Sequence, residues 1–263
     1  MSMDWESVFL LPEAAYAGGR RIPKTVLTSR AMLTKHEQRT LGKIRRLEHF
    51  ATVAKGTAQV LPRVDDDYDI QSVIFLRCEM SRDSQAVAEV SRLLHSCFPN
   101  PTVILLEADG QIAVSVGLTR KSHAERGATV VYDIESTGLF DPSDSRYAPF
   151  LEALSFGNLQ QDDLLAFLQC LSSCVRLSQA VSALGMYPTC VPEDRESLLA
   201  LVADYKQQQA EIDELASKRN ARDVTPNESA KLRMQMRRAQ QQRDIALSEI
   251  RGLCITPNEG SGR

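Results

Sequence analysis

The sequence predicts an α+β fold: an antiparallel or mixed sheet with packed helices, followed by a C-terminal antiparallel helical hairpin that resembles a coiled coil. Every strand-like apolar run lies before Asp141-Pro142, whereas the apolar spacing after that point is helical. Two long arms rich in charged residues and glutamine then end the chain. We expect an α+β core over residues 1–190, a hairpin over 191–254 and a disordered tail over 255–263.

The first half carries signals for a helix and two strands. Thr34 and Glu37 have the spacing of a capping box, which predicts a short helix from Lys35 to about Lys43. A strand is expected from Ile44 to about residue 53. The run from Asp69 to Met80 is β-branched and aromatic, which predicts a second strand.

The next segment alternates between helix and strand. Ser81 is placed to cap a helix that ends before Pro99, because proline cannot continue a helix. Residues 102–108 and 111–118 flank Asp109-Gly110, a pair that suits the positive φ angles of a type I′ turn and predicts a β-hairpin. Residues 130–134 predict a further strand.

A helix follows the predicted sheet. Its apolar face runs from Leu164 to Val181. We expect Asn158 to cap this helix and Gly185 to end it.

The C-terminal arms show complementary seams. The first seam contains Leu198, Val202, Tyr205, Ile212 and Leu215, and the second contains Leu232, Met236, Ala239, Ala246, Ile250 and Leu253. Thr225-Pro226 with Glu228 predicts a capping box with proline at the first helical position. Glutamines interrupt both seams, so we expect the hairpin to need support from the core or a partner. Leu199, Leu201 and Leu247 are expected to be exposed and to bind that partner, and self-association through the hairpin is an alternative.

Composition excludes several classes. The longest apolar runs are far shorter than the ~20 residues that span a bilayer, and no basic leader precedes the first apolar patch. We expect a cytoplasmic protein without membrane contact. The six cysteines are scattered, which favours reduced thiols over a disulfide framework.

No sequence motif indicates a particular enzymatic reaction. The four histidines are well separated, the Cys170/Cys174 pair lies on an apolar helical face, and no glycine-rich phosphate loop appears. We therefore expect no metal, no cofactor and no catalytic residue, although a nucleophile and a histidine can still meet in the fold. The alternative is a metal-dependent nuclease or other hydrolase that uses the acidic run Asp65–Asp69 with Glu107.

Residues 19–55 are strongly basic, with ten lysines or arginines against two glutamates. Such a surface can release counterions from nucleic acid. The alternative is a solvated face that pairs with Asp65–Asp69. The candidate nucleic-acid-binding residues are Arg20, Arg21, Lys24, Arg30, Lys35, Arg39, Lys43, Arg45 and Arg46.

The order of these features resembles a bacterial and archaeal family, domain of unknown function 4391. The resemblance is carried by Leu11-Pro12, Ile22-Pro23-Lys24, Leu33-Thr34 with Glu37, Leu41 and Ile44, the strand ending at Met80, Pro99-Asn100-Pro101, the β-hairpin and the charged arms. The family supplies no activity and no catalytic residues. Its members are encoded beside helicases and DNA methyltransferases in restriction or phage-defence clusters. The resemblance therefore implies an accessory subunit of a DNA-acting machine. Together with the missing catalytic motifs and the basic stretch, it leads us to expect a noncatalytic adaptor that binds a helicase or methyltransferase, with DNA contact as a further expectation.

Overall fold

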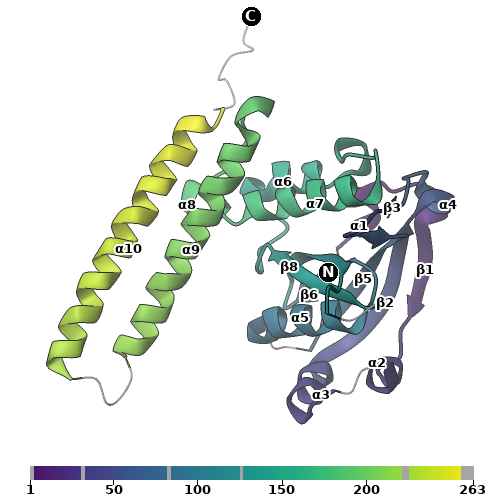
Figure 1. Ribbon diagram of the computed structural model, residues 1–263, viewed down its shortest axis with the longest axis horizontal. Coiled ribbons are helices and arrows are strands. Elements are labelled where there is room, and N and C mark those ends of the chain that lie inside the picture. Colours follow the sequence, from purple (N-terminus) through teal and green to yellow (C-terminus); the bar gives the residue numbers. More distant parts are fainter. Residues whose placement is uncertain (1–2, 31–32, 82–83, 125–126, 221–224, 256–263) are drawn as a thin grey trace, which may run out of the picture. The chain divides into compact units, whose positions relative to one another are not determined.

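A computed structural model describes residues 3–30, 33–81, 84–124, 127–220 and 225–255 (Figure 1). Its strands are β1 (Tyr16–Arg21), β2 (Ile44–Val53), β3 (Arg63–Val64), β4 (Asp69–Ile70), β5 (Val73–Met80), β6 (Thr102–Ala108), β7 (Gln111–Lys121) and β8 (Thr129–Ser136). Its α-helices are α1 (Trp5–Phe9), α2 (Lys24–Arg30), α3 (Lys35–Gly42), α4 (Lys55–Ala58), α5 (Val87–Cys97), α6 (Ala148–Ala153), α7 (Leu164–Ser178), α8 (Val181–Leu184), α9 (Arg195–Arg219) and α10 (Pro226–Leu253). The predicted α+β class is confirmed.

The main sheet is mixed, with strand order β1-β2-β5-β6-β7-β8. Only β5 and β6 pair in parallel, and α5 makes the crossover between them. The remaining neighbours are antiparallel. A parallel pair needs such a crossover, whereas antiparallel strands can be joined by short turns. The predicted β-hairpin is confirmed, since Asp109 and Gly110 have φ angles of 50° and 81°.

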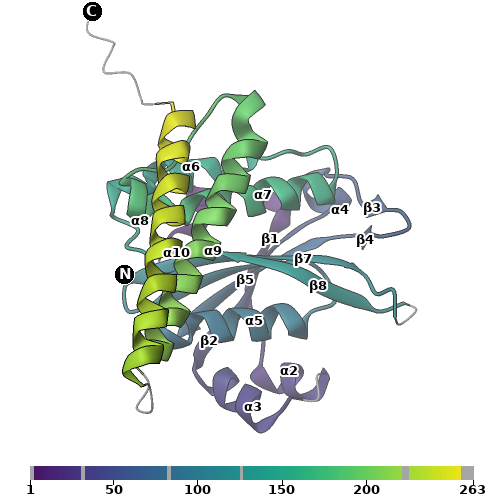
Figure 2. The same ribbon diagram turned by 60° about the vertical axis from the view of Figure 1, so that its left-hand side comes forward.

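Helices cover both faces of this sheet. Figure 2 shows α5 on one face and α6 with α7 on the other. Leu76, Ile104 and Leu94 belong to the buried cluster on the α5 face. On the opposite face, Phe75 packs edge-on against Phe9 of α1 at 5.2 Å between ring centroids. Residues of alternate parity on each central strand therefore serve two apolar layers.

Local signals set most helix boundaries. The capping box of Thr34 and Glu37 is formed, and so is that of Thr225 and Glu228. Two expected caps are wrong. Asp163, and not Asn158, accepts from the amides at the start of α7. The helix expected after Ser81 begins at Val87, behind a 3₁₀ turn over Ser84–Ala86, so Ser81 is not its cap.

The chain forms two compact units, residues 1–175 and 176–263. The second unit therefore begins before the boundary that the sequence suggests, and includes α8 and the long pair α9 and α10. The helix expected to end at Gly185 ends at Ser178 instead, and Gly185 ends the separate short helix α8 in the left-handed conformation. The predicted disordered tail lies outside the described residues except for Ile255. Within the part of the chain that the structure describes, no helix combines the length and apolar character needed to cross a membrane.

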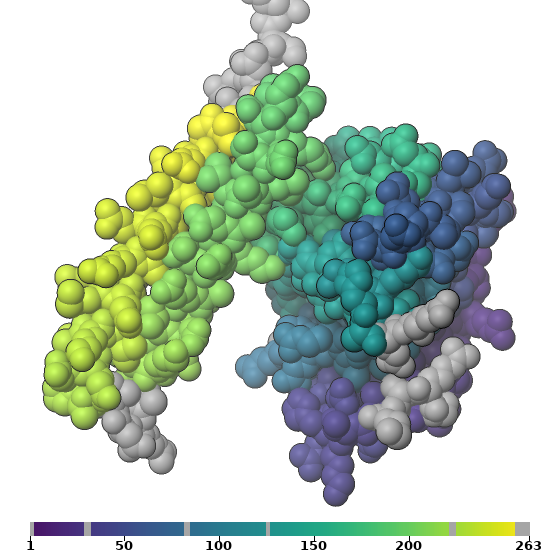
Figure 3. Space-filling view, in the orientation of Figure 1, coloured from purple at the N-terminus to yellow at the C-terminus, as the bar shows by residue number. Residues whose placement is uncertain are grey.

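Helices α9 and α10 pack side by side along their length, as Figure 3 shows. The predicted seams are largely confirmed, because Leu198, Val202, Ile212, Ala246 and Ile250 are buried. Glutamine enters the seam as expected: Gln208 is buried, and Arg243 Nη1 donates to the side-chain oxygen Oε1 of Gln209 at 3.2 Å. This polar layer interrupts an otherwise apolar contact.

Candidate nucleic-acid interface and its acidic neighbour

The basic stretch forms a groove where β1 leads into α2. The groove has a volume of about 490 Å³ and is lined by Arg21, Ile22, Pro23, Lys24, Thr25, Arg45, Arg46 and Leu47. Two segments that are distant in sequence thus contribute two cations each. Four cations around one groove make a surface suited to anions.

Strand pairing explains this convergence. Arg21 is the register partner of Glu48, and the amide of Ile22 donates to the Leu47 carbonyl at 2.8 Å. Pro23 then turns the chain into α2, whose first residue is Lys24. The end of β1 is therefore held beside the first half of β2, and their basic side chains meet there.

The ion pairs leave these cations accessible. Arg45 pairs with Glu79 at 2.6 Å between Nη2 and Oε1, and its side chain remains 69% exposed. Arg46 pairs with Glu48 and remains 57% exposed, whereas the Glu48 side chain is 8% exposed. Neither Arg21 nor Lys24 forms an ion pair within the described residues. The Lys24 ammonium donates to the Gly42 carbonyl at 3.4 Å.

Four other predicted nucleic-acid-binding residues do not line the groove: Arg20, Lys35, Arg39 and Lys43. Arg20, Lys35 and Arg39 are exposed elsewhere on β1 and α3. Lys43 pairs with Glu89 at 3.7 Å. The side chain of Arg30 lies outside the described part of the structure. Of the predicted residues whose side chains are described, Arg21, Lys24, Arg45 and Arg46 line the groove.

An acidic hollow adjoins the groove and shares Arg45 with it. The hollow has a volume of about 440 Å³, and its lining includes the carboxylates of Asp4, Glu79, Glu107 and Asp109. Glu79 and Glu107 are register partners on the parallel strands β5 and β6. The sequence predicts neither the hollow nor its geometry, because the parallel pairing that joins these glutamates is a tertiary feature.

Glu107 is held by two donors from distant parts of the chain. Its Oε1 accepts from Arg77 Nε at 2.8 Å and from the Trp5 indole at 2.9 Å. Arg77 also donates to Oε2 at 3.4 Å. A carboxylate with these partners is neutralised and oriented. Among the described residues no group of three or more histidine, cysteine or acidic side chains is placed to hold a metal ion.

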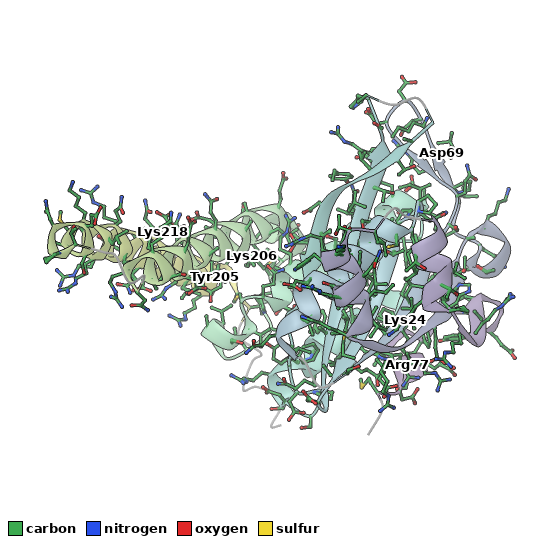
Figure 4. All side chains as sticks on the ribbon, turned by 90° about the horizontal axis from the view of Figure 1, so that it is seen from below. Lys24, Asp69, Arg77, Tyr205, Lys206 and Lys218 are labelled. Atoms are coloured by element: carbon green, nitrogen blue, oxygen red, sulfur yellow. The ribbon has the colours of Figure 1, made fainter. Side chains whose placement is uncertain are left out.

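The acidic run Asp65–Asp69 lies at the opposite end of the sheet from Glu107. Glu107 pairs with Ile112 near the start of β7, whereas Lys121 at its end donates to the Asp65 carbonyl. The stretch of β7 between these two positions spans roughly 30 Å. Figure 4 likewise places Asp69 far from Arg77, the partner of Glu107. The nuclease alternative requires carboxylates of Asp65–Asp69 to lie close to Glu107, and in this fold they do not.

Asp65 of the acidic run is occupied by contacts with its own neighbours in sequence. Asp65 accepts from Arg63 Nε at 2.6 Å and from the amides of Asp67 and Tyr68. The bond from Arg63 is the main reason why the pKa of Asp65 is lowered. These are local turn contacts. Among the described residues, Asp65 does not form the pairing with residues 19–55 that the alternative interpretation of the basic stretch requires.

One histidine does meet hydroxyl side chains in the fold, but inside the core. His95 Nδ1 is hydrogen-bonded to Thr102 Oγ1 at 2.6 Å, and Nε2 to Ser115 Oγ at 2.9 Å. His95 is 1% exposed, and burial lowers its pKa to about 3. A substrate cannot reach this cluster without opening the core, so its role is to orient α5 on the sheet.

The predicted partner face of the hairpin needs correction. Leu199, Leu201 and Leu247 are partly buried, so the expectation that they are exposed is wrong. The exposed large apolar side chains of α10 are Met234 at 62% and Ile245 at 51%. Eleven residues separate them, which is about three helical turns and places both on one face.

The fold and site define an α+β protein with a basic groove, an adjoining acidic hollow and a helical hairpin. The chain belongs to the family described as Domain of unknown function (DUF4391), whose model matches residues 9–242. This confirms the resemblance found in the sequence. No curated protein and no solved structure matches the chain.

Proposed function

We propose that the protein is a noncatalytic adaptor of a DNA-acting system, in which the basic groove contacts the phosphate backbone and the hairpin binds a protein partner. The observation that carries this proposal is the convergence of Arg21, Lys24, Arg45 and Arg46 on one groove. Arginine and lysine supply the sequence-independent part of nucleic-acid affinity.

The acidic hollow beside the basic groove restricts the path that a bound nucleic-acid strand can take. The exposed carboxylates of Asp4 and Asp109 in the hollow repel a phosphate backbone, so a bound strand follows the groove and avoids the hollow. Arg45 lines both the groove and the hollow, and it forms an ion pair with Glu79. Its guanidinium is thereby positioned and still exposed, which suits bidentate contact with a phosphate.

The nature of the partner rests on the family resemblance. A helicase or DNA methyltransferase of a restriction or phage-defence system is the partner we propose. The exposed Met234 and Ile245, with Arg237 and Arg238 between them, provide an apolar and basic face on α10. A partner with an apolar and acidic helix fits such a face.

The nucleic-acid contact is tested by salt dependence. The variant Arg21→Ala, Lys24→Ala, Arg45→Ala and Arg46→Ala should bind duplex or single-stranded DNA more weakly. The slope of log K against log salt should fall by about 0.7 to 0.9 for each phosphate that the variant no longer neutralises. A matched variant removes the same charge outside the groove: Arg20→Ala, Lys35→Ala, Arg39→Ala and Lys55→Ala.

Two outcomes would overturn the groove assignment. One is no binding of wild-type protein at low salt. The other is an equal loss of affinity in the matched variant, which would indicate a diffuse charge effect. Folding of both variants is checked by circular dichroism.

The partner contact is tested separately. Met234→Glu with Ile245→Glu should abolish co-purification with a co-expressed neighbouring helicase or methyltransferase. Gln207→Glu with Ala210→Glu adds the same charge to α9 and should leave co-purification intact. Co-purification that survives the first variant would remove this face from the proposal.

The hydrolase alternative has its own test. Wild-type protein is incubated with DNA or RNA and Mg²⁺ or Mn²⁺, beside Glu107→Gln and a variant with Asp67→Asn and Asp69→Asn. We expect no cleavage. Cleavage that either substitution abolishes would replace the adaptor with a nuclease.

A further inference from the structure

The segments that lead into and out of the hairpin run side by side. The amide of Ile255, just after α10, donates to the carbonyl of Thr189 at 2.8 Å. Thr189 precedes the 3₁₀ turn over Pro192–Asp194 that starts α9. A backbone hydrogen bond thus closes the base of the hairpin, within the second compact unit.

This bond brings two cysteines into the same region of the fold. Cys190 directly follows Thr189, and Cys254 directly precedes Ile255, so each cysteine is the chain neighbour of one of the two hydrogen-bonded residues. Disulfides form over Cα separations of about 4.4 to 6.8 Å.

The electrostatics of the two thiols agree with this placement. Burial raises the pKa of Cys254, a backbone hydrogen bond with Thr189 lowers it, and the neighbouring Cys190 raises it. The last effect shows that the two thiols lie within electrostatic reach of each other. Burial also raises the pKa of Cys190.

Both thiols are reduced and only partly buried, so a small oxidant can reach them. Cys78 and Cys174 are buried by comparison, whereas Cys97 and Cys170 are partly buried on α5 and α7. Cys97 and Cys170 therefore serve as controls of similar accessibility.

We propose that Cys190 and Cys254 form a redox-active dithiol, which closes to an intramolecular disulfide at the base of the hairpin. The oxidant is a small disulfide of the glutathione class. The thiolate of one cysteine attacks the oxidant and releases one thiol, and the second thiolate then displaces the other. Two protein thiols lose two electrons and two protons, and one disulfide becomes two thiols.

The link would close a loop around the whole hairpin. A cross-link between residues 190 and 254 restricts the unfolded chain and so stabilises α9 against α10. The hydrogen bond between Ile255 and Thr189 already holds the two segments together at this point. The proposal is independent of the adaptor function.

Full-length reduced protein is incubated in glutathione buffers of increasing oxidised fraction, quenched with acid and alkylated. Peptide mapping should find one pair of joined peptides, containing Cys190 and Cys254, with the mass of two hydrogen atoms missing. The thermal midpoint of the helical signal should rise on oxidation. Closure should accelerate from pH 7 to pH 9, because the attacking species is the thiolate and both pKa values are raised.

Cys190→Ser and Cys254→Ser should each abolish the link and the rise in the midpoint, whereas Cys97→Ser and Cys170→Ser should retain both. A short bifunctional thiol reagent should join the same two peptides in reduced, unsubstituted protein, which tests proximity without a variant. The proposal is overturned if oxidation yields only glutathione adducts or intermolecular disulfides, or if the reagent joins other cysteines.

Discussion

A methyl group at Gly117 would lie 2.5 Å from Nδ1 of His95. The imidazole cannot retreat freely, because Thr102 and Ser115 hold its two nitrogens. Ser91 on α5 donates to Ser115 at 2.7 Å and completes the cluster. The missing side chain of one β7 residue therefore makes room for the histidine that ties α5 to β6 and β7.

Gly117→Ala should lower the free energy of unfolding by about 1 to 3 kcal/mol, since the core must shift to admit the methyl group. Denaturant unfolding followed by the fluorescence of Trp5, the single tryptophan, measures this in the sheet unit. Gly56→Ala is the control, because no atom lies within 4 Å of its added methyl group. Equal stability of the two variants would contradict the close approach.

The free energy of unfolding should fall as pH decreases through the range set by His95. Burial lowers its pKa in the folded protein from the usual 6.5 to about 3, so the unfolded chain binds the proton first. The stabilisation by the neutral ring is complete above pH 6.5 and is lost as pH falls towards 3, with a slope of up to about 1.4 kcal/mol per pH unit. His95→Gln should flatten the profile, whereas His123→Gln, at an exposed position, should not.

Glu107 and Glu79 should differ in their effect on stability although they are register partners. Glu107→Ala leaves Arg77 and the Trp5 indole without this acceptor and should cost about 1 to 3 kcal/mol. Glu79→Ala removes an ion pair with a largely exposed Arg45 and should cost less than about 1 kcal/mol. Denaturant titrations of both variants measure the loss in the free energy of unfolding. A larger loss for Glu79→Ala than for Glu107→Ala would contradict this prediction.

Two isoleucines of α10 provide a matched test of the seam. Ile250 is 0% exposed, and Ile250→Ala should destabilise the hairpin by about 2 to 5 kcal/mol. Ile245 is 51% exposed, and Ile245→Ala should change stability little. Thermal melts followed by the helical circular dichroism signal compare the two variants. An equal loss of stability in both would show that Ile250 does not lie in the seam as described.

The buried glutamine of the seam should be replaceable. Gln208 is 9% exposed, and its Oε1 has no hydrogen-bond partner among the described residues. Gln208→Leu should therefore raise the thermal midpoint of the hairpin, since an apolar side chain removes an unsatisfied acceptor. Gln207→Leu changes an exposed neighbour and should not. A lowered midpoint for Gln208→Leu would mean that the polar layer sets the register of the arms.

The sequence by itself determined the features that depend on neighbouring residues. Two capping boxes, one turn and one helical seam could be predicted from the sequence: those at Thr34 and Thr225, the type I′ turn at Asp109-Gly110 and the seam that includes Ile250. Each of them depends on residues that lie close together in the chain. The α+β class followed from the same local periods. Tertiary structure decided which distant residues share a site. The pairing of β1 with β2 assembled the basic groove, and the parallel pairing of β5 with β6 brought Glu79 beside Glu107. Asp65–Asp69 was placed at the far end of β7 for the same reason: strand order and register arise from packing between segments that no local pattern connects.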